Sequence, residues 1–279
     1  MKPMNYTLRK RLTQICFQLL LLFGSLFILA PLAIMVLGSF KDVKEAAELS
    51  LSLPSVWHFE NYQVVFEKGE IGQAMINSTI ITVSSVVVTL ISSSLASFYL
   101  ARCNNAFSRR IMSVFMMGLI APISLIPTIT LLQKLHINNT YFGVIMVFCS
   151  LNMAFSVLLF TGFIKTIPRQ LDEAAVMDGC GPIRTFFLVI FPLLLPVIVT
   201  GIIVVFMNVW NNFMIPLYFL SDSSKWPMPL TVYNFFGKYQ SSWNLVFADL
   251  VMTALPILLV YLLGQKYIID GMTTGAVKG

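Results

Sequence analysis

One polar segment holds the residues of this chain that are best suited to recognise another protein. It interrupts two long apolar runs. Its acidic and small residues are Glu173, Ala174, Ala175, Asp178 and Gly179. Pro168 suits the first turn of a helix, acids near a helix start are favoured by the helix dipole, and Gly179 can close the far end. Because small side chains allow close approach and carboxylates fix orientation, we predict a short docking helix, with an ordinary amphipathic connector as the alternative.

Sequence patterns that carry catalysis are missing from the chain. It has no Gly-x-x-x-x-Gly-Lys-Ser/Thr phosphate loop, and it has neither His-Glu-x-x-His nor Gly-x-Ser-x-Gly. The four cysteines lack paired spacing, which predicts neither a disulfide framework nor a zinc site. We therefore expect a protein that is not an enzyme, holds no metal and takes any energy from ATP through a partner.

Membrane-spanning helices must position these residues. Hydrophobic residues fill 57% of the 279 positions and charged residues 11%, whereas about a quarter of a soluble domain is charged. Six apolar ranges are long enough to cross roughly 30 Å of hydrocarbon. They are 15–38, 76–100, 111–132, 143–164, 189–213 and 246–266. Inside lipid, the backbone N–H and C=O groups must form hydrogen bonds within the protein, which only helices and closed β-barrels allow. The sequence lacks the alternating pattern of a barrel, so we predict an all-α membrane protein with six transmembrane helices.

Basic residues predict the orientation of these helices. With the N-terminus inside, the cytoplasmic segments hold 12 Lys and Arg residues and the outer segments hold 6. Both termini and the segment around Glu173 are then expected in the cytoplasm. This topology accounts for the net charge of +6, which leaves no case for nucleic-acid binding.

The polar residues inside predicted spans two to five are uncharged. Spans two to five contain no Asp, Glu, His, Lys or Arg, which disfavours a carrier driven by protons or ions and an embedded enzyme. Hydroxyls recur on one face of span two, at Ser78, Thr82, Ser85, Thr89 and Ser92. They predict close helix packing, with the lining of a solute path as the alternative.

Three ordered motifs resemble one family. Glu173-Ala174-Ala175, Gly179 and the later Ile190-Phe191-Pro192 resemble the cytoplasmic signature of permease subunits in binding-protein-dependent, ATP-driven importers. The run 210–217 with the later Pro229-Leu230 resembles the end of the fifth core helix of sugar permeases, and residues 271–279 resemble the tail of the maltose-type subunit without a large extra domain. Cys180 departs from the signature, where Ala is common. The resemblance extends from about residue 77 to residue 279.

This resemblance implies an ABC type I importer permease fold and a division of the chain. The parts are a cytoplasmic N-terminus (1–14), a first transmembrane helix (15–38), an extracytoplasmic loop (39–75), a five-helix core (76–266) with a coupling loop (165–188) and an outer loop (214–245), and a cytoplasmic tail (267–279). The implied partners are a second permease subunit in a heterodimer, two ATP-binding subunits and an extracytoplasmic sugar-binding protein, in a bacterial plasma membrane. The chain would bind no cofactor, because ATP and Mg belong to the partner subunits. The tail, through Gly275, Ala276 and Lys278, is expected to contact the ATP-binding subunit.

Two further groups are candidates for contact with the sugar or its receptor. Asn208, Trp210, Asn211 and Asn212 are the candidate pathway residues. The amides are expected to share a helix face and need partners or water in lipid, and the indole could lie flat against a sugar. Joining the two permease subunits is the alternative role for this group. Tyr233, Phe235, Phe236 and Tyr239 are the candidate receptor-docking residues, because this loop has more aromatics than a membrane belt requires.

Two other transport functions compete with a sugar importer. A glycerol-phosphate importer would favour Arg or Lys along the path, and the spans offer none. A secondary carrier would work without ATP and without partner subunits. We therefore predict the permease subunit of an importer for a sugar or oligosaccharide.

Overall fold

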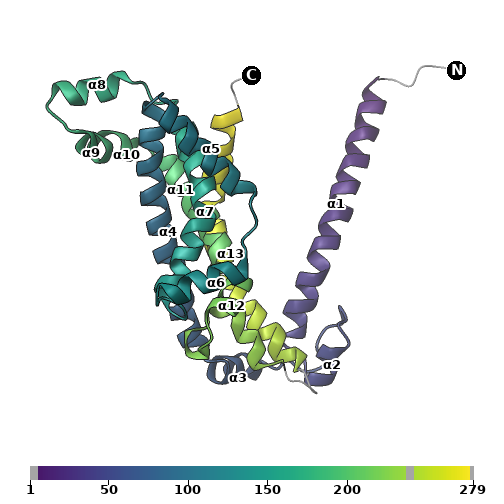
Figure 1. Ribbon diagram of the computed structural model, residues 1–279. Helices are drawn as coiled ribbons and strands as arrows, with labels where there is room; N and C mark the ends of the chain where they lie inside the picture. The colour runs from purple at the N-terminus through teal and green to yellow at the C-terminus, as the bar shows by residue number, and fades with distance from the viewer. Residues whose placement is uncertain (1–5, 237–241, 277–279) are drawn as a thin grey trace. The chain divides into compact units, whose positions relative to one another are not determined.

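Every secondary-structure element that the structure describes is a helix (Figure 1). The computed structural model describes residues 6–236 and 242–276, with side chains for 13–236 and 242–265. The elements are α1 (Tyr6–Gly38), α2 (Val43–Ala47), α3 (Glu60–Lys68), α4 (Ile71–Arg102), α5 (Ala106–Ile120), α6 (Leu125–Lys134), α7 (Tyr141–Ile164), α8 (Gln170–Met177), α9 (Pro182–Thr185), the π-helical turn η1 (Phe186–Ile190), α10 (Phe191–Leu193), α11 (Leu195–Trp210), α12 (Met214–Phe219), the 3₁₀ turns η2 (Ser223–Lys225) and η3 (Met228–Asn234), and α13 (Trp243–Ala276).

Four of the described helices are long and apolar enough to cross a membrane, or six spans exist if each of two bent pairs counts as one. The four are Thr13–Gly38, Ile71–Arg102, Tyr141–Ile164 and Trp243–Gln265. The predicted third span is bent by 119° between α5 and α6, and the predicted fifth span by 80° between α10 and α11. Pro122 lies at the first break, and Pro192 and Pro196 flank the second. Proline lacks the N–H donor and clashes with the preceding turn, so apolar length alone overestimated the continuity of both spans.

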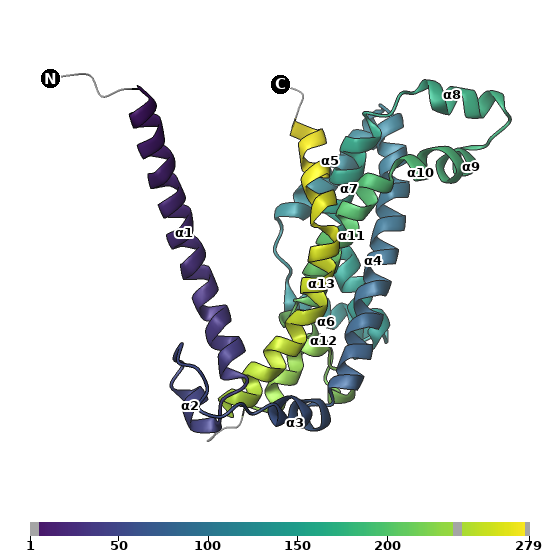
Figure 2. The same ribbon diagram turned by 180° about the vertical axis from the view of Figure 1, so that it is seen from behind.

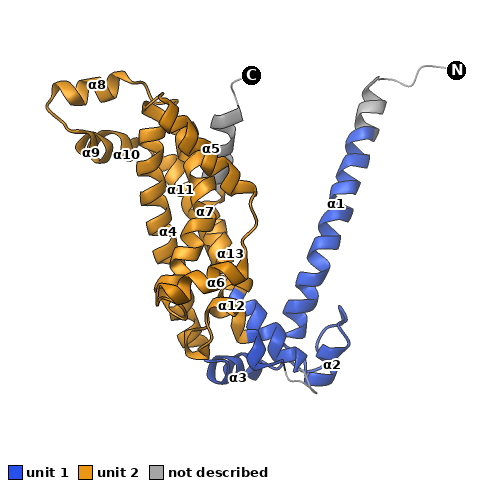
Figure 3. Ribbon diagram, viewed as in Figure 1, with its two compact units in different colours: residues 1–70, 232–253 blue, residues 71–231, 254–279 orange. Residues whose placement is uncertain are grey.

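The described residues form two compact units (Figure 3). Unit 1 contains residues 1–70 and 232–253, and unit 2 contains residues 71–231 and 254–279. In unit 1, the buried amide of Asn61 donates to the backbone oxygens of Ser39 and Lys41 at 2.9 and 3.0 Å. The amide of Asn244 on α13 donates to Asn61 Oδ1 at 2.9 Å. Paired amides therefore connect α3 to the end of α1 and to the start of α13.

The core of unit 2 lies between α4, α7, η1 and α11. Phe148, Phe160, Phe186, Ile190 and Leu194 are all fully buried there. Four of the five hydroxyls predicted on one face of span two, at positions 78, 82, 85 and 89, are at most 2% exposed. Ser97 Oγ on α4 donates to the Val157 oxygen of α7 at 3.0 Å. The prediction of close helix packing on this face is confirmed, because small hydroxyl residues let two helices approach.

The second half of α13 runs beside α11 within unit 2 (Figures 1 and 2). Gly264 marks their close approach, because a Cβ atom at this position would overlap the side chain of Ile203. The helix continues to Ala276, so residues 267–276, which were predicted as a tail after the last span, are its end. Glycine inside a helix costs only about 1 kcal/mol, so Gly271 and Gly275 do not stop it.

Candidate functional site

The segment around Glu173 forms the predicted short helix, which a turn and a second short helix follow. The first turn starts where the Pro168 oxygen accepts from the Leu171 N–H, and α8 then runs to Met177. Gly179 has a φ of +79°, and the N–H of Cys180 donates to the Ala175 oxygen at 2.9 Å. Glycine adopts this left-handed conformation without the Cβ penalty that other residues meet. In Figure 1, α8 and α9 project from the rest of unit 2 at one end of α4.

The two alanines of this segment lie on different faces of α8. Ala175 is 5% exposed and packs inward, whereas Ala174 is exposed. Glu173, Asp178 and Gly179 are also exposed, so four of the five predicted contact residues are open to a partner.

Three exposed apolar residues accompany them, and sequence reasoning did not select them. Met177 is 87% exposed, Ile183 72% and Val176 62%. Apolar residues at the centre of an otherwise polar loop were the available signal. The projecting segment therefore offers an apolar contact surface beside its carboxylates.

An ion pair fixes the start of α8 to the end of α4. Arg102 Nε lies 2.5 Å from Asp172 Oδ2, and the two side chains are only 12% and 20% exposed. The same guanidinium donates to the backbone oxygens of Ile164 and Ile167 at 3.2 and 3.1 Å. Its Nη2 donates to Asp172 Oδ1 at 3.3 Å, and a guanidinium that bonds to a carboxylate makes a strong, charge-assisted contact. Arg102 was counted in the sequence only as a cytoplasmic charge, because its partners are 62 to 70 positions away.

The return path from α9 enters the core directly. Phe186 and Ile190 in η1 are at most 1% exposed, and the Phe186 ring centroid is 5.6 Å from that of Phe98 on α4. The bend between α10 and α11 follows immediately. Packed side chains therefore connect the projecting segment to the start of α11.

The candidate pathway residues divide where α11 ends. α11 ends at Trp210, and Asn212 Oδ1 accepts from the Ile215 N–H at 2.9 Å. This local bond competes with continuation of the helix, so the predicted common face does not extend to Asn212. Asn208 is exposed and donates to Asn152 Oδ1 at 3.1 Å, and Asn211 is exposed.

Trp210 lies inside unit 2. Its side chain is 4% exposed and stacks on Phe206 with ring centroids 5.4 Å apart. In this conformation its flat face is covered by protein and is not open to a sugar.

The candidate docking residues also divide between surface and interior. Tyr233 is 44% and Phe236 47% exposed, whereas Phe235 is 7% exposed. A Cβ atom on Gly69 would lie 3.0 Å from the Phe235 ring, so this ring fills space against the end of α3. Tyr239 lies outside the described residues, as does Lys278 of the predicted tail contact. Gly275 and Ala276 are in the last turn of α13.

Comparisons with known proteins agree on one family. Residues 93–273 match the model of the binding-protein-dependent transport system inner membrane component. The multiple sugar-binding transport system permease protein MsmG of Streptococcus mutans is 35% identical over 93% of this chain and 95% of its own. The melibiose/raffinose/stachyose import permease protein MelC of Bacillus subtilis is 33% identical over 81% of this chain and 83% of its own.

A solved structure has the same fold. A chain of a bacterial ABC transporter involved in the import of the acidic polysaccharide alginate superposes with a TM-score of 0.84 at 22% identity. The match covers 95% of this chain and 99% of that chain.

Proposed function

Since the chain belongs to the binding-protein-dependent transport system inner membrane component family, we propose that it is the permease subunit of an ATP-driven importer for a sugar or oligosaccharide. The observation that carries this proposal is the 35% identity to a multiple sugar-binding permease along almost the whole of both chains. A neutral sugar is preferred, because predicted spans two to five carry no Arg or Lys that would pair with a phosphate or carboxylate.

The proposed assembly contains a second permease subunit, two ATP-binding subunits and an extracytoplasmic sugar-binding protein. ATP and Mg would be bound by the ATP-binding subunits and by no residue of this chain. The proposed topology has six spans, in which each of the two bent helix pairs counts as one. The 12 to 6 distribution of basic residues supports both termini in the cytoplasm. In this orientation α8 and α9 face the ATP-binding subunits.

Coupling would begin at the exposed face of α8. Closure of the ATP-binding pair would push on this helix, with Glu173 paired to a basic residue of the partner and Met177 in an apolar contact. The ion pair between Arg102 and Asp172 and the packing of Phe186 would carry the force to α4 and α11. The spans would then move as rigid groups between inward-open and outward-open states.

The sugar path would include the exposed amides of Asn208 and Asn211. Asn208 already pairs with Asn152 on α7, and each amide retains groups that can bond to water or a sugar hydroxyl. Trp210 would act by packing behind this surface. The alternative role of this region, contact with the second permease, would bury the same amides.

The test is ATP hydrolysis by the reconstituted assembly with a panel of sugar-loaded receptors. One loaded receptor should stimulate hydrolysis and uptake together. Glu173→Arg should reduce uptake at least tenfold with unchanged membrane insertion, whereas Glu48→Arg, an exposed acid next to α2 in unit 1, should leave uptake unchanged. Uptake that persists without nucleotide and ATP-binding subunits would instead establish a secondary carrier.

A further inference from the structure

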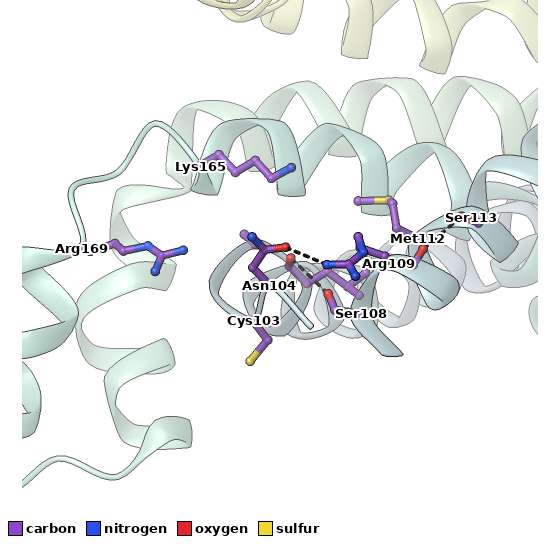
Figure 4. Close-up of a pocket in the computed structure, with 10 residues that line it drawn as sticks. Cys103, Asn104, Ser108, Arg109, Met112, Ser113, Lys165 and Arg169 are labelled. Atoms are coloured by element: carbon purple, nitrogen blue, oxygen red, sulfur yellow. Dashed lines mark hydrogen bonds between the residues drawn. The ribbon is translucent and has the colours of Figure 1, made fainter. Parts of the chain in front are cut away.

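A basic cavity in unit 2 is not used by the proposed coupling mechanism. It has a volume of about 540 Å³ and lies where α4 and α7 end and α5 begins. Arg109 lines it from the first turn of α5, and Lys165 and Arg169 line it from the connection between α7 and α8. Figure 4 shows Lys165 on one side of the space and Asn104 with Arg109 on the other.

Within the part of the chain whose side chains are described, the three cations of this cavity have no carboxylate that neutralises them. None of the described residues that line the cavity is acidic. Among the described side chains the ion pairs are those of Glu60, Asp172 and Asp222, and none includes Arg109, Lys165 or Arg169. The guanidinium of Arg109 donates only to a neutral amide, Asn104 Oδ1, at 3.4 Å. A cleft lined by one sign of charge concentrates counter-ions of the other sign, so this cavity favours an anion.

The position of the cavity relative to the expected membrane indicates which kind of anion it can bind. α4 and α7 are candidate spans, and they end at Arg102 and Ile164, so the cavity lies at the level where hydrocarbon gives way to lipid headgroups. Its wall includes the apolar side chains of Leu100 and Met112. A soluble phosphate would use only the cations. A phospholipid has a phosphate for the cations and an acyl chain for the apolar wall.

We propose that this cavity binds the headgroup of an anionic phospholipid. Arg109, Lys165 and Arg169 would surround the phosphate, and Met112 would contact the start of an acyl chain. Basic pockets between spans on the cytoplasmic side are suited to anionic lipids, because that leaflet carries them. The assignment to the inner leaflet rests on the proposed orientation. The preference of the cavity for an anionic lipid rests only on the residues that line it. Because the same connection leads into α8, a bound lipid would hold the base of the coupling segment.

The experiment measures lipid binding to the purified full-length chain in mixed micelles, by native mass spectrometry during titration. Phosphatidylglycerol should bind at least tenfold more tightly than phosphatidylcholine. Arg109→Gln and Lys165→Gln should each weaken phosphatidylglycerol binding about fivefold, which corresponds to about 1 kcal/mol for a basic residue near an anionic surface. Arg110→Gln is the matched control, because this exposed neighbour does not line the cavity and should bind as the unchanged chain does.

Three results would overturn the proposal. They are equal affinity for the two lipids, an equal loss for Arg110→Gln, and displacement of the lipid by inorganic phosphate or glycerol phosphate at comparable concentrations, which would identify a site for a soluble anion. The comparison of two lipids uses the unchanged chain, so it stands even where a variant is not monodisperse. No partner subunit or transport is involved, so failure here is distinct from failure of the proposed importer function.

Discussion

Gly179 and Gly181 flank the same turn but are under different constraints. A Cβ atom would meet nothing within 4 Å at either position. Only Gly179 has a left-handed φ, at +79°, whereas Gly181 has a φ of −75° and caps α9. Position 179 therefore requires glycine because of its backbone conformation and not because of crowding by neighbouring atoms.

Alanine substitutions at these two glycines separate conformation from packing. Gly179→Ala should destabilise the turn by about 1–2 kcal/mol, the usual cost of the left-handed region for a residue with a Cβ atom. Gly181→Ala should have little effect on the turn. Hydrogen exchange of residues 170–185 should rise in the first variant only, with a parallel loss of coupling in the reconstituted assembly. Equal exchange in both variants would show that the turn relaxes without strain.

Arg102 and Asp172 form one ion pair, but Arg102 makes more contacts than Asp172 does. Arg102→Gln removes the partner of a carboxylate and of two backbone oxygens, whereas Asp172→Asn keeps the bonds from Arg102 to those oxygens. We expect Arg102→Gln to weaken the docking of α8 by about 1–3 kcal/mol and Asp172→Asn by less, because unpaired, partly buried groups cost the most.

Exchange of the amides in 165–178 measures this docking, and a double-mutant cycle isolates the pair. Arg110→Gln, an exposed arginine on α5, serves as the control for lost charge. If Asp172→Asn loosened α8 more than Arg102→Gln, the carbonyl contacts would be irrelevant to docking.

Elements constrain what each residue can do, and the region around η3 illustrates this. Four aromatics were predicted there as one docking group, yet Phe235 is buried beside Gly69 and Tyr233 is exposed. The buried Phe235 ring therefore packs within unit 1, whereas the Tyr233 side chain reaches the surface.

This division gives opposite expectations for two alanine variants. Phe235→Ala should destabilise unit 1 by about 3–5 kcal/mol, as loss of a buried aromatic does. Tyr233→Ala should lower the melting temperature much less than Phe235→Ala, because the Tyr233 side chain is 44% exposed, and should weaken receptor binding at least tenfold, as an exposed aromatic anchor does. Phe66→Ala, an exposed aromatic on α3, is the control. Thermal melts and receptor titration in nanodiscs measure both effects, and intact binding by Tyr233→Ala would remove this residue from the docking surface.

At the scale of the whole molecule, the orientation of the chain in the membrane determines which segments can meet the receptor and which can meet the ATP-binding subunits. In a variant without the four native cysteines, Leu53→Cys in unit 1 and Met177→Cys in unit 2 introduce thiols at positions 73% and 87% exposed. An impermeant maleimide added to intact cells should label the first and reach the second only after permeabilisation, because the proposed topology puts α8 on the cytoplasmic side. Labelling of Met177→Cys from outside would invert the topology and the proposed leaflet of the basic cavity.

The sequence alone determined the membrane class, the all-helical fold and the helix that Gly179 closes. These features depend on local properties, namely apolar length, backbone pairing in lipid and the conformational freedom of single residues. The breaks in the third and fifth spans were visible as prolines, but apolar length outweighed them.

Only the tertiary structure decided which side chains meet. Arg102 and Asp172 are 70 positions apart, and Arg109 and Lys165, which line one cavity, are joined by no sequence pattern. The burial of Trp210 and Phe235 likewise depends on what packs over them. Contacts of this kind are fixed by how helices distant in sequence fold onto one another, because a side chain's environment is set by its neighbours in space and not by its neighbours along the chain.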